Sequence, residues 1–223
     1  MRFRCFALVI GLALFGASCT DDSPDAAAPK VTPTTVPAPT QPSTTVIPVL
    51  QGPTVELTGN SVGGITLGTD AETAIAAMTK LFGPPVADSG WGPQEAPCDN
   101  MGTRSRSVSW NSFLAFLATG PTELVKKPGD HLSAYLLVGG GTEDIGGPAG
   151  ERFVVSDGKP ILGRTLAEVQ KWAPKAEKFN SEIEGPAWVE NAKDTGMSGS
   201  LSTAAGDSVE RTSTARAGLF CID

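Results

Sequence analysis

A stretch rich in proline and threonine, residues 20–54, limits which part of this 223-residue chain can fold. It holds eight prolines and eight threonines and has no aromatic residue. Such a segment cannot bury enough apolar surface to offset the entropy lost on ordering, and its prolines favour extended polyproline geometry. We therefore expect a disordered, semi-rigid spacer, and we expect the folded part to begin near residue 55 and to be large enough for a hydrophobic core.

The residues before this stretch are typical of an export signal. Arg2 and Arg4 give a positive start, and residues 6–15 are apolar but too few to span a bilayer as a helix. Small residues then lead to Cys19. Residues 16–19, Gly-Ala-Ser-Cys, resemble the lipobox of bacterial lipoproteins, in which the chain is cut just before an acylated cysteine.

This resemblance implies a signal peptide over residues 1–18 and an acyl group such as palmitate on Cys19. The protein is then expected on the extracytoplasmic face of the cell membrane, held there by its lipid anchor. Residues 19–54 would form the lipidated start and the tether. Gly16 stands where the lipoprotein family prefers Leu, so cleavage by an ordinary signal peptidase nearby is the alternative.

The negative net charge argues against nucleic acids and anionic lipid headgroups as partners. The whole chain has 17 basic and 24 acidic residues, and removal of the two arginines in residues 1–18 leaves a formal charge of −9. An acidic surface repels nucleic acids and anionic lipid headgroups. We therefore expect no nucleic-acid partner, and we expect membrane attachment through acyl chains rather than through a basic patch.

The cysteines are informative once the signal is removed. Cys5 leaves with the signal and Cys19 is assigned to the lipid, which leaves Cys98 and Cys221. In an oxidising compartment this even remainder favours one disulfide bond, with two buried free thiols as the alternative. The sequence has a single histidine and no C-x-x-C spacing, which argues against a zinc site.

A weak internal repeat organises the folded part. Residues 67–71, LGTDA, recur as LGRTL at residues 162–166, and both segments open a helical pattern. Asp70 and Thr165 are suited to cap the two helices, with Thr69 as an alternative first cap. Apolar residues that share one helical face are expected at Ala71, Ala74, Ile75 and Met78 in the first helix, and at Leu166, Val169, Trp172 and Ala173 in the second.

Strand-like segments follow each helical pattern. In the first half they span residues 106–110, 113–118 and 132–138, and in the second half residues 187–190, 197–203, 209–213 and 217–221. The first two are expected to form a hairpin. This order predicts an α+β fold of two tandem repeats, each a helix followed by an antiparallel sheet, over residues 55–150 and 151–223.

Short motifs in the first repeat resemble a known family. Residues 68–70 (GTD) precede the first helix, residues 81–84 (LFGP) follow it, and Trp91 comes next. This order resembles the β-lactamase-inhibitor-like fold, shared by secreted inhibitors and small outer-membrane-assembly lipoproteins. The resemblance implies helices on one face of an antiparallel sheet. Cys98 and Trp110, with a cysteine near the chain end, also resemble uncharacterised lipoproteins of high-GC Gram-positive bacteria.

Two serine motifs suggest hydrolytic chemistry but lack the structural context that it needs. Residues 59–63 match G-x-S-x-G around Ser61, with His131 downstream, yet a glycine-broken extended segment follows where a helix is required. Ser156 opens an S-x-x-K motif, which needs both residues on one helical turn. Residues 157–158, Asp-Gly, predict a hairpin turn there instead. We therefore expect no catalytic residue, no metal and no cofactor.

These observations favour a lipid-anchored binding or scaffolding module whose partner is an envelope protein or a cell-wall component. Trp91, Trp110 and Trp188 are core residues by default, but an exposed pair among them would mark a binding surface. The alternatives are a cell-envelope serine hydrolase acting through Ser61 or Ser156, and an inhibitor of a secreted enzyme.

Overall fold

The computed structural model of the chain describes residues 52–94, 102–139, 150–182, 184–190 and 196–218. All of these residues belong to one unit, Val46–Asp223. The predicted signal peptide, most of the predicted tether, the lipidation of Cys19 and both cysteines of the predicted disulfide, Cys98 and Cys221, lie outside the described residues.

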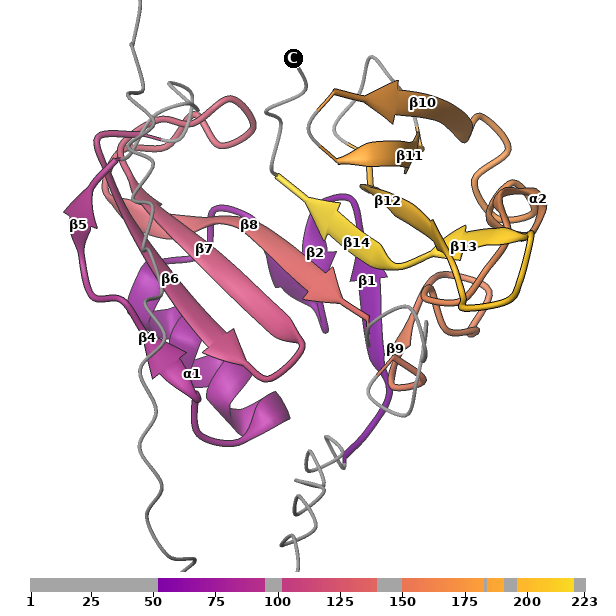
Figure 1. The fold of residues 1–223 in the computed structure, drawn as a ribbon. Helices are drawn as coiled ribbons and strands as arrows, with labels where there is room; N and C mark the ends of the chain where they lie inside the picture. The colour runs from indigo at the N-terminus through magenta and orange to yellow at the C-terminus, as the bar shows by residue number, and fades with distance from the viewer. Residues whose placement is uncertain (1–51, 95–101, 140–149, 183, 191–195, 219–223) are drawn as a thin grey trace, which may run out of the picture. The chain divides into compact units, whose positions relative to one another are not determined.

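One long antiparallel sheet is the main feature of the fold (Figure 1). In sheet order its strands are β10 (Glu177–Ser181), β11 (Gly185–Val189), β12 (Ser198–Thr203), β14 (Thr214–Ala217), β8 (Asp130–Val138), β7 (Phe113–Thr119), β6 (Arg104–Trp110) and β4 (Ala87–Asp88), with β13 (Glu210–Thr212) paired to β12 and β5 (Gly92–Pro93) paired to β6. The sheet joins strands from both halves of the sequence, because β14 pairs with β8.

The β6–β7 hairpin confirms the hairpin that alternation of polar and apolar residues predicts. Trp110 pairs with Phe113 at its closed end. Asn111 in the turn has a φ of 52°, a conformation that asparagine tolerates better than most residues. Alternate residues near the closed end of the hairpin are buried on one face, and this burial fixes the register of the two strands; these residues are Val108, Trp110, Phe113, Ala115 and Leu117.

A second, smaller sheet has the order β3 (Ile65–Thr66), β2 (Ser61–Val62), β1 (Val55–Thr58) and β9 (Phe153–Val154). Strands β1 and β9 pair in parallel, whereas the other pairs are antiparallel. The hydroxyl of Tyr135 on β8 donates a hydrogen bond of 2.5 Å to the carbonyl of Thr58, which ties the small sheet to the long one.

Both helices begin at the predicted caps. The side chain of Asp70 accepts a hydrogen bond of 3.0 Å from the backbone N–H of Thr73 at the start of α1 (Ala71–Phe82). Thr165 and Glu168 form a capping box at the start of α2 (Leu166–Val169). Helix α1 packs on β8 and buries Ala71, Ala74, Met78 and Phe82. No helix in the described ranges is long and apolar enough to cross a membrane.

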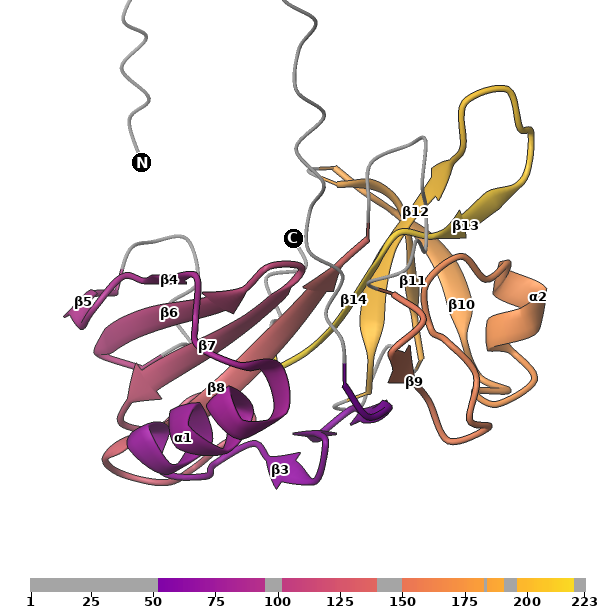
Figure 2. The ribbon, with the colours of Figure 1, turned by 90° about the horizontal axis from the view of Figure 1, so that it is seen from below.

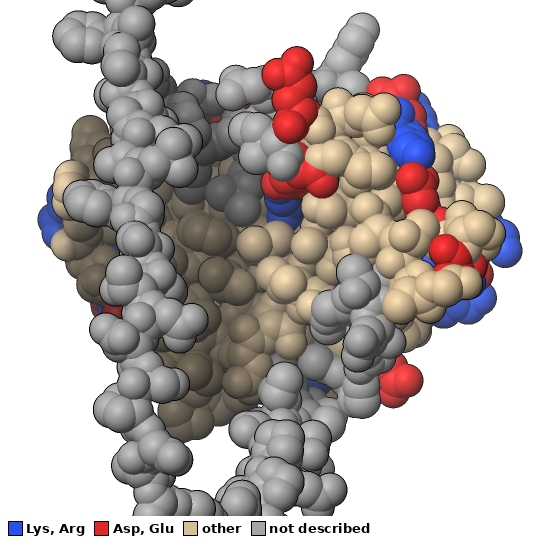
Figure 3. All heavy atoms as spheres, in the orientation of Figure 1, with Lys and Arg blue, Asp and Glu red and all other residues tan. Residues whose placement is uncertain are grey.

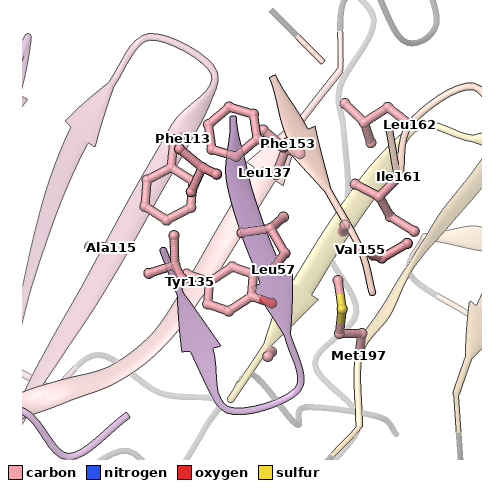
Figure 4. Close-up of a cluster of buried hydrophobic side chains, with 14 of the residues drawn as sticks. Leu57, Phe113, Ala115, Tyr135, Leu137, Phe153, Val155, Ile161, Leu162 and Met197 are labelled. Atoms are coloured by element: carbon pink, nitrogen blue, oxygen red, sulfur yellow. The ribbon is translucent and has the colours of Figure 1, made fainter. Parts of the chain in front are cut away.

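The hydrophobic core lies between the inner face of the long sheet, α1 and the small sheet. The ring of Phe113 stacks on that of Phe153, with centroids 5.6 Å apart, and it contacts Phe82 at 5.0 Å. Figure 4 shows that the core continues past these rings towards residues of the second half, namely Val155, Ile161, Leu162 and Met197. The two halves therefore share one core.

The predicted fold class, two tandem helix-then-sheet repeats, is wrong. The described part of the chain is mostly β-sheet, with 43% of its residues in strands and 11% in helices, and its strands form two sheets. Strands of the two halves pair in both sheets, β14 with β8 and β1 with β9, and α2 has only four residues. The repeated LG motif marks two similar helix starts, in which Gly68 and Gly163 both have positive φ. A capping motif specifies where a helix begins, not the sheet that follows it.

Candidate functional site

The long sheet has one face covered by described elements and one face that is not. Directly paired residues of antiparallel strands point to the same side. The inner face packs on α1 and the small sheet. Figure 2 shows that α1 lies on this inner side of the long sheet. We call the outer face the open face, and define it by Ser107, Ser109, Leu114, Phe116, Leu136, Val138, Ser198, Ser200, Thr214 and Arg216. Its β11–β12 end is buried, because Ser198 is 1% exposed and its partner Val189 on β11 is 3% exposed.

A single row of directly paired residues crosses five strands of the open face. From β6 to β12 it runs through Ser109, Leu114, Leu136, Arg216 and Ser198. Leu114 and Leu136 are only half-buried, unlike their neighbours on the inner face. The row therefore places two partly exposed leucines next to one cationic side chain.

The open face combines apolar and hydroxyl side chains: four of the ten residues that define it are apolar, five are serine or threonine, and one is Arg216. Phe116 is partly exposed, and 37% of Val138 is accessible to solvent. In Figure 3, which has the orientation of Figure 1, the visible surface near the middle of the view is mostly tan with one small group of red and blue spheres, whereas more charged side chains gather on the right. Partly exposed apolar side chains that lie side by side on a surface are a feature of interaction sites.

Arg216 supplies the positive charge of this face, and the carboxylate of Glu184 accepts a hydrogen bond from its guanidinium. The Arg216 Nε donates to Ser198 Oγ over 3.2 Å. The hydroxyl of Ser200 donates to the second carboxylate oxygen of Glu184 over 3.1 Å. The side chain of Arg216 is 13% exposed, so its charge is largely withdrawn from water and is balanced by Glu184.

Threonine and serine side chains on β14 and β12 continue this cluster. The backbone N–H of Ser200 donates to Thr214 Oγ1 over 2.7 Å. The Thr214 hydroxyl in turn donates to Ser200 Oγ over 3.2 Å. The hydroxyls therefore form a chain from Thr214 through Ser200 to Glu184, and strand alternation holds them on one side of the sheet.

The three tryptophans proposed as a binding surface do not form one. Trp110 and Trp188 are 1% and 0% exposed, so both belong to the core. The Nε1 of Trp110 donates to the carbonyl of Gly83, and Trp188 meets Trp172 edge-on with centroids 6.2 Å apart. Trp91 is partly exposed beneath the guanidinium of Arg104. Large aromatic rings gain most from burial, which is why they anchor the core here.

The two serines of the hydrolase alternative lie in turns and short strands. Ser61 begins β2 in a hairpin, and its hydroxyl forms a hydrogen bond of 2.7 Å with Thr58 Oγ1. Ser156 lies in the predicted turn, where Gly158 has a φ of 73°. His131 is fully buried, and its Nδ1 lies 3.1 Å from the carbonyl oxygen of Gly129. Neither serine has the strand-to-helix or helical context that its motif requires.

Other charged clusters among the described residues hold the fold together. Arg106 binds Asp88 and Glu72, which links α1 to β6 and β4. The hydrogen bonds from Arg106 lower the pKa of Asp88 to about 2. The guanidinium of Arg164 donates two hydrogen bonds to the carboxylate of Asp157, beside the turn at Gly158. The described residues contain no group of three or more His, Cys, Asp or Glu side chains placed to hold a metal ion.

Sequence analysis did not identify the polar cluster of the open face. Glu184 lies outside the predicted strands, and the last predicted strand spans residues 217–221, so Arg216 falls before it. The alternation Thr-Ala-Arg-Ala over residues 214–217 was the available signal, since it predicts Thr214 and Arg216 on one face of a strand.

Comparisons of the chain with models of protein families, with curated proteins and with solved structures found no match.

Proposed function

We propose that this protein is a lipid-anchored, extracytoplasmic binding module whose partner docks on the open face. The observation that carries the proposal is the row through Leu114, Leu136 and Arg216, which presents partly exposed apolar side chains around a single neutralised charge. The partner would be an envelope protein or a cell-wall component, and the acidic chain disfavours a nucleic acid. Acyl chains on Cys19 would supply the membrane attachment, and the proline-threonine tether would set the distance from the membrane.

The edges of the long sheet favour docking on its face over the addition of a strand. Edge strand β10 carries Glu177 and Lys178, and Lys178 pairs with Glu210 over 2.7 Å. The opposite edge ends in the two-residue strands β4 and β5. Charged side chains and short strands at an edge oppose pairing with another chain. A partner would therefore gain more from covering the open face.

Photo-crosslinking in intact cells tests this proposal. p-Benzoylphenylalanine in place of Phe116 would lie on the open face, whereas the same group in place of Val209, which is 40% exposed and lies outside the open face, is the matched control. We expect a discrete crosslinked product from position 116 and none of the same mass from position 209. If position 116 gives no product, or both positions give the same one, the open face is not the docking surface. A secreted enzyme as the crosslinked partner would favour the alternative of an enzyme inhibitor.

A further inference from the structure

The carboxylate of Glu184 is held on the open face as a bound ligand would be. It accepts hydrogen bonds from the Arg216 guanidinium on β14 and from the Ser200 hydroxyl on β12. Glu184 itself belongs to neither strand, because it precedes Gly185, the first residue of β11. Its side chain is 32% exposed, compared with 13% for Arg216. The two donors, Arg216 and Ser200, are therefore residues of sheet strands, whereas the acceptor, Glu184, lies outside those strands and is more exposed than Arg216.

The two donors have supports that do not involve Glu184. Ser198 accepts from Arg216 Nε over 3.2 Å, which orients the guanidinium. Thr214 donates to Ser200 Oγ over 3.2 Å and accepts from the Ser200 backbone, which orients the hydroxyl. A site that is organised before its ligand arrives loses less entropy on binding. The pair of donors would therefore persist if another carboxylate replaced that of Glu184.

The surroundings of Arg216 indicate what such a carboxylate would be attached to. Leu136 is the direct neighbour of Arg216 on β8, and Leu114 is the next residue of the same row on β7. Val138 is paired with Thr214 on the adjacent row. A ligand whose carboxylate bound Arg216 would lay its remaining part over these apolar side chains.

The charge of the site favours a carboxylate over a phosphate. One guanidinium and one hydroxyl suit a singly charged carboxylate better than a doubly charged phosphate, which would leave excess negative charge in an acidic protein.

We propose that the open face binds the C-terminal carboxylate of an apolar peptide segment of its partner, and that Glu184 occupies this carboxylate site in the free protein. The inference rests on the proposed function, since it names the chemistry that the open face recognises.

Two serine hydroxyls on the open face favour a peptide ligand: Ser109 lies in the same row as the leucines, and Ser107 lies beside Phe116. Covering these hydroxyls with an alkyl chain would leave them without hydrogen-bond partners, whereas peptide amides can satisfy them. This favours a peptide over a fatty acid.

A peptide-retention assay on the full-length protein in detergent tests the inference. The probe is a pool of N-acetylated tetrapeptides of Leu, Val, Phe and Ser, made once with free C-terminal carboxylates and once with C-terminal amides. The acid-to-amide ratio of retained peptides is measured by mass spectrometry for the wild type, Glu184→Gln, and Glu184→Gln combined with Arg216→Gln. Glu210→Gln breaks an ion pair outside the open face and serves as the matched control.

We expect Glu184→Gln to raise the acid-to-amide ratio about tenfold over the wild type, the factor expected if Glu184 fills the site about nine-tenths of the time. The added Arg216→Gln change should return the ratio to about one, and Glu210→Gln should leave the wild-type ratio unchanged. Equal retention of acids and amides by Glu184→Gln, or a preference that survives Arg216→Gln, would overturn the carboxylate site. Octanoate that displaces the retained acids at lower concentration than the free-acid peptides do would overturn the peptide assignment.

Two further measurements keep these outcomes interpretable. Near-ultraviolet circular dichroism reports the packing of the buried side chains of Trp110 and Trp188, so it shows whether a variant has lost its fold. If Arg216→Gln has done so, Arg216→Lys takes its place, because lysine keeps the charge but not the forked geometry of the guanidinium. A crosslink from position 116 without any acid preference would mean that the open face docks a partner through other chemistry. The proposed function would then stand while this inference failed.

Discussion

Val55 on β1 pairs in parallel with Phe153 on β9, so the start of the folded part and the start of its second half are neighbours in one sheet. The backbone N–H of Val55 donates to the carbonyl of Arg152 over 2.8 Å. Arg152 in turn donates from Nε to the carbonyl of Pro53 over 2.7 Å, and its Nη2 binds the carbonyl of Leu81 in the last turn of α1. These contacts join the end of the predicted tether, α1 and β9.

Phe153→Ala is expected to destabilise the whole unit, not its second half alone. Phe153 is fully buried and contacts the rings of Phe82 and Phe113 across the shared core. Truncation of a buried phenylalanine costs about 3–5 kcal/mol through lost burial and the cavity left behind. Urea unfolding monitored by near-ultraviolet circular dichroism should show one transition at lower urea. Two transitions, with only one of them shifted, would show that the halves fold separately.

The surface variant Val209→Ala is the control for Phe153→Ala. Val209 is 40% exposed, so its truncation should change the free energy of unfolding by less than about 0.5 kcal/mol.

Asp88→Asn should reduce the loss of stability that occurs between about pH 4 and pH 2. Arg106 lowers the pKa of Asp88 from 3.8 to about 2. Because the pKa is lower in the folded state, this ion pair stabilises the fold above about pH 4 and ceases to do so as the pH falls through 2. The carboxylate is 35% exposed, so solvent screening limits the effect to about 1 kcal/mol or less.

Urea unfolding of the wild type and Asp88→Asn at pH 7, 4 and 2.5 measures this difference. The variant should be less stable at pH 7, and the gap between the two proteins should narrow towards pH 2.5. A gap that stays constant over this range would mean that Asp88 does not contribute through its charge.

Cys19→Ser should release the protein from the membrane or leave the precursor uncut. The prediction depends on the positive start, the short apolar region and the small residues before Cys19, and on the disordered tether that is expected after it. Cell fractionation followed by immunoblotting distinguishes the outcomes. A processed Cys19→Ser protein that still sediments with membranes would show that some other feature attaches it.

Cys98 and Cys221 are predicted to form a disulfide bond. In the chain-entropy model a loop of this length stabilises the fold by up to about 4–5 kcal/mol, reduced by any native strain. Mass spectrometry of a non-reduced digest should find the two cysteine-containing peptides linked. Complete alkylation of both thiols in the denatured, unreduced protein would instead show that they are free.

Features set by neighbouring residues could be read from the sequence. The turn at Asn111, the caps at Asp70 and Thr165, and the turn at Gly158 each depend on a few adjacent residues whose hydrogen bonds and backbone preferences are local. The strands β6, β7 and β8 were predicted for the same reason, since their alternation or apolar character extends over at least seven residues.

Features that depend on distant partners were decided only by the tertiary structure. Strands β1, β2, β3 and β9 have two to four residues each, too few for a periodic signal, and β10 is a charged edge strand that the pattern did not predict. The pairing of β8 with β14 merged two expected repeats into one sheet. The same pairing brought Arg216 beside Leu136, and packing in the core buried Trp188. Sequence alone determined the local starts and turns because those energies are local, whereas the open face was decided by strand pairing between residues far apart in the chain.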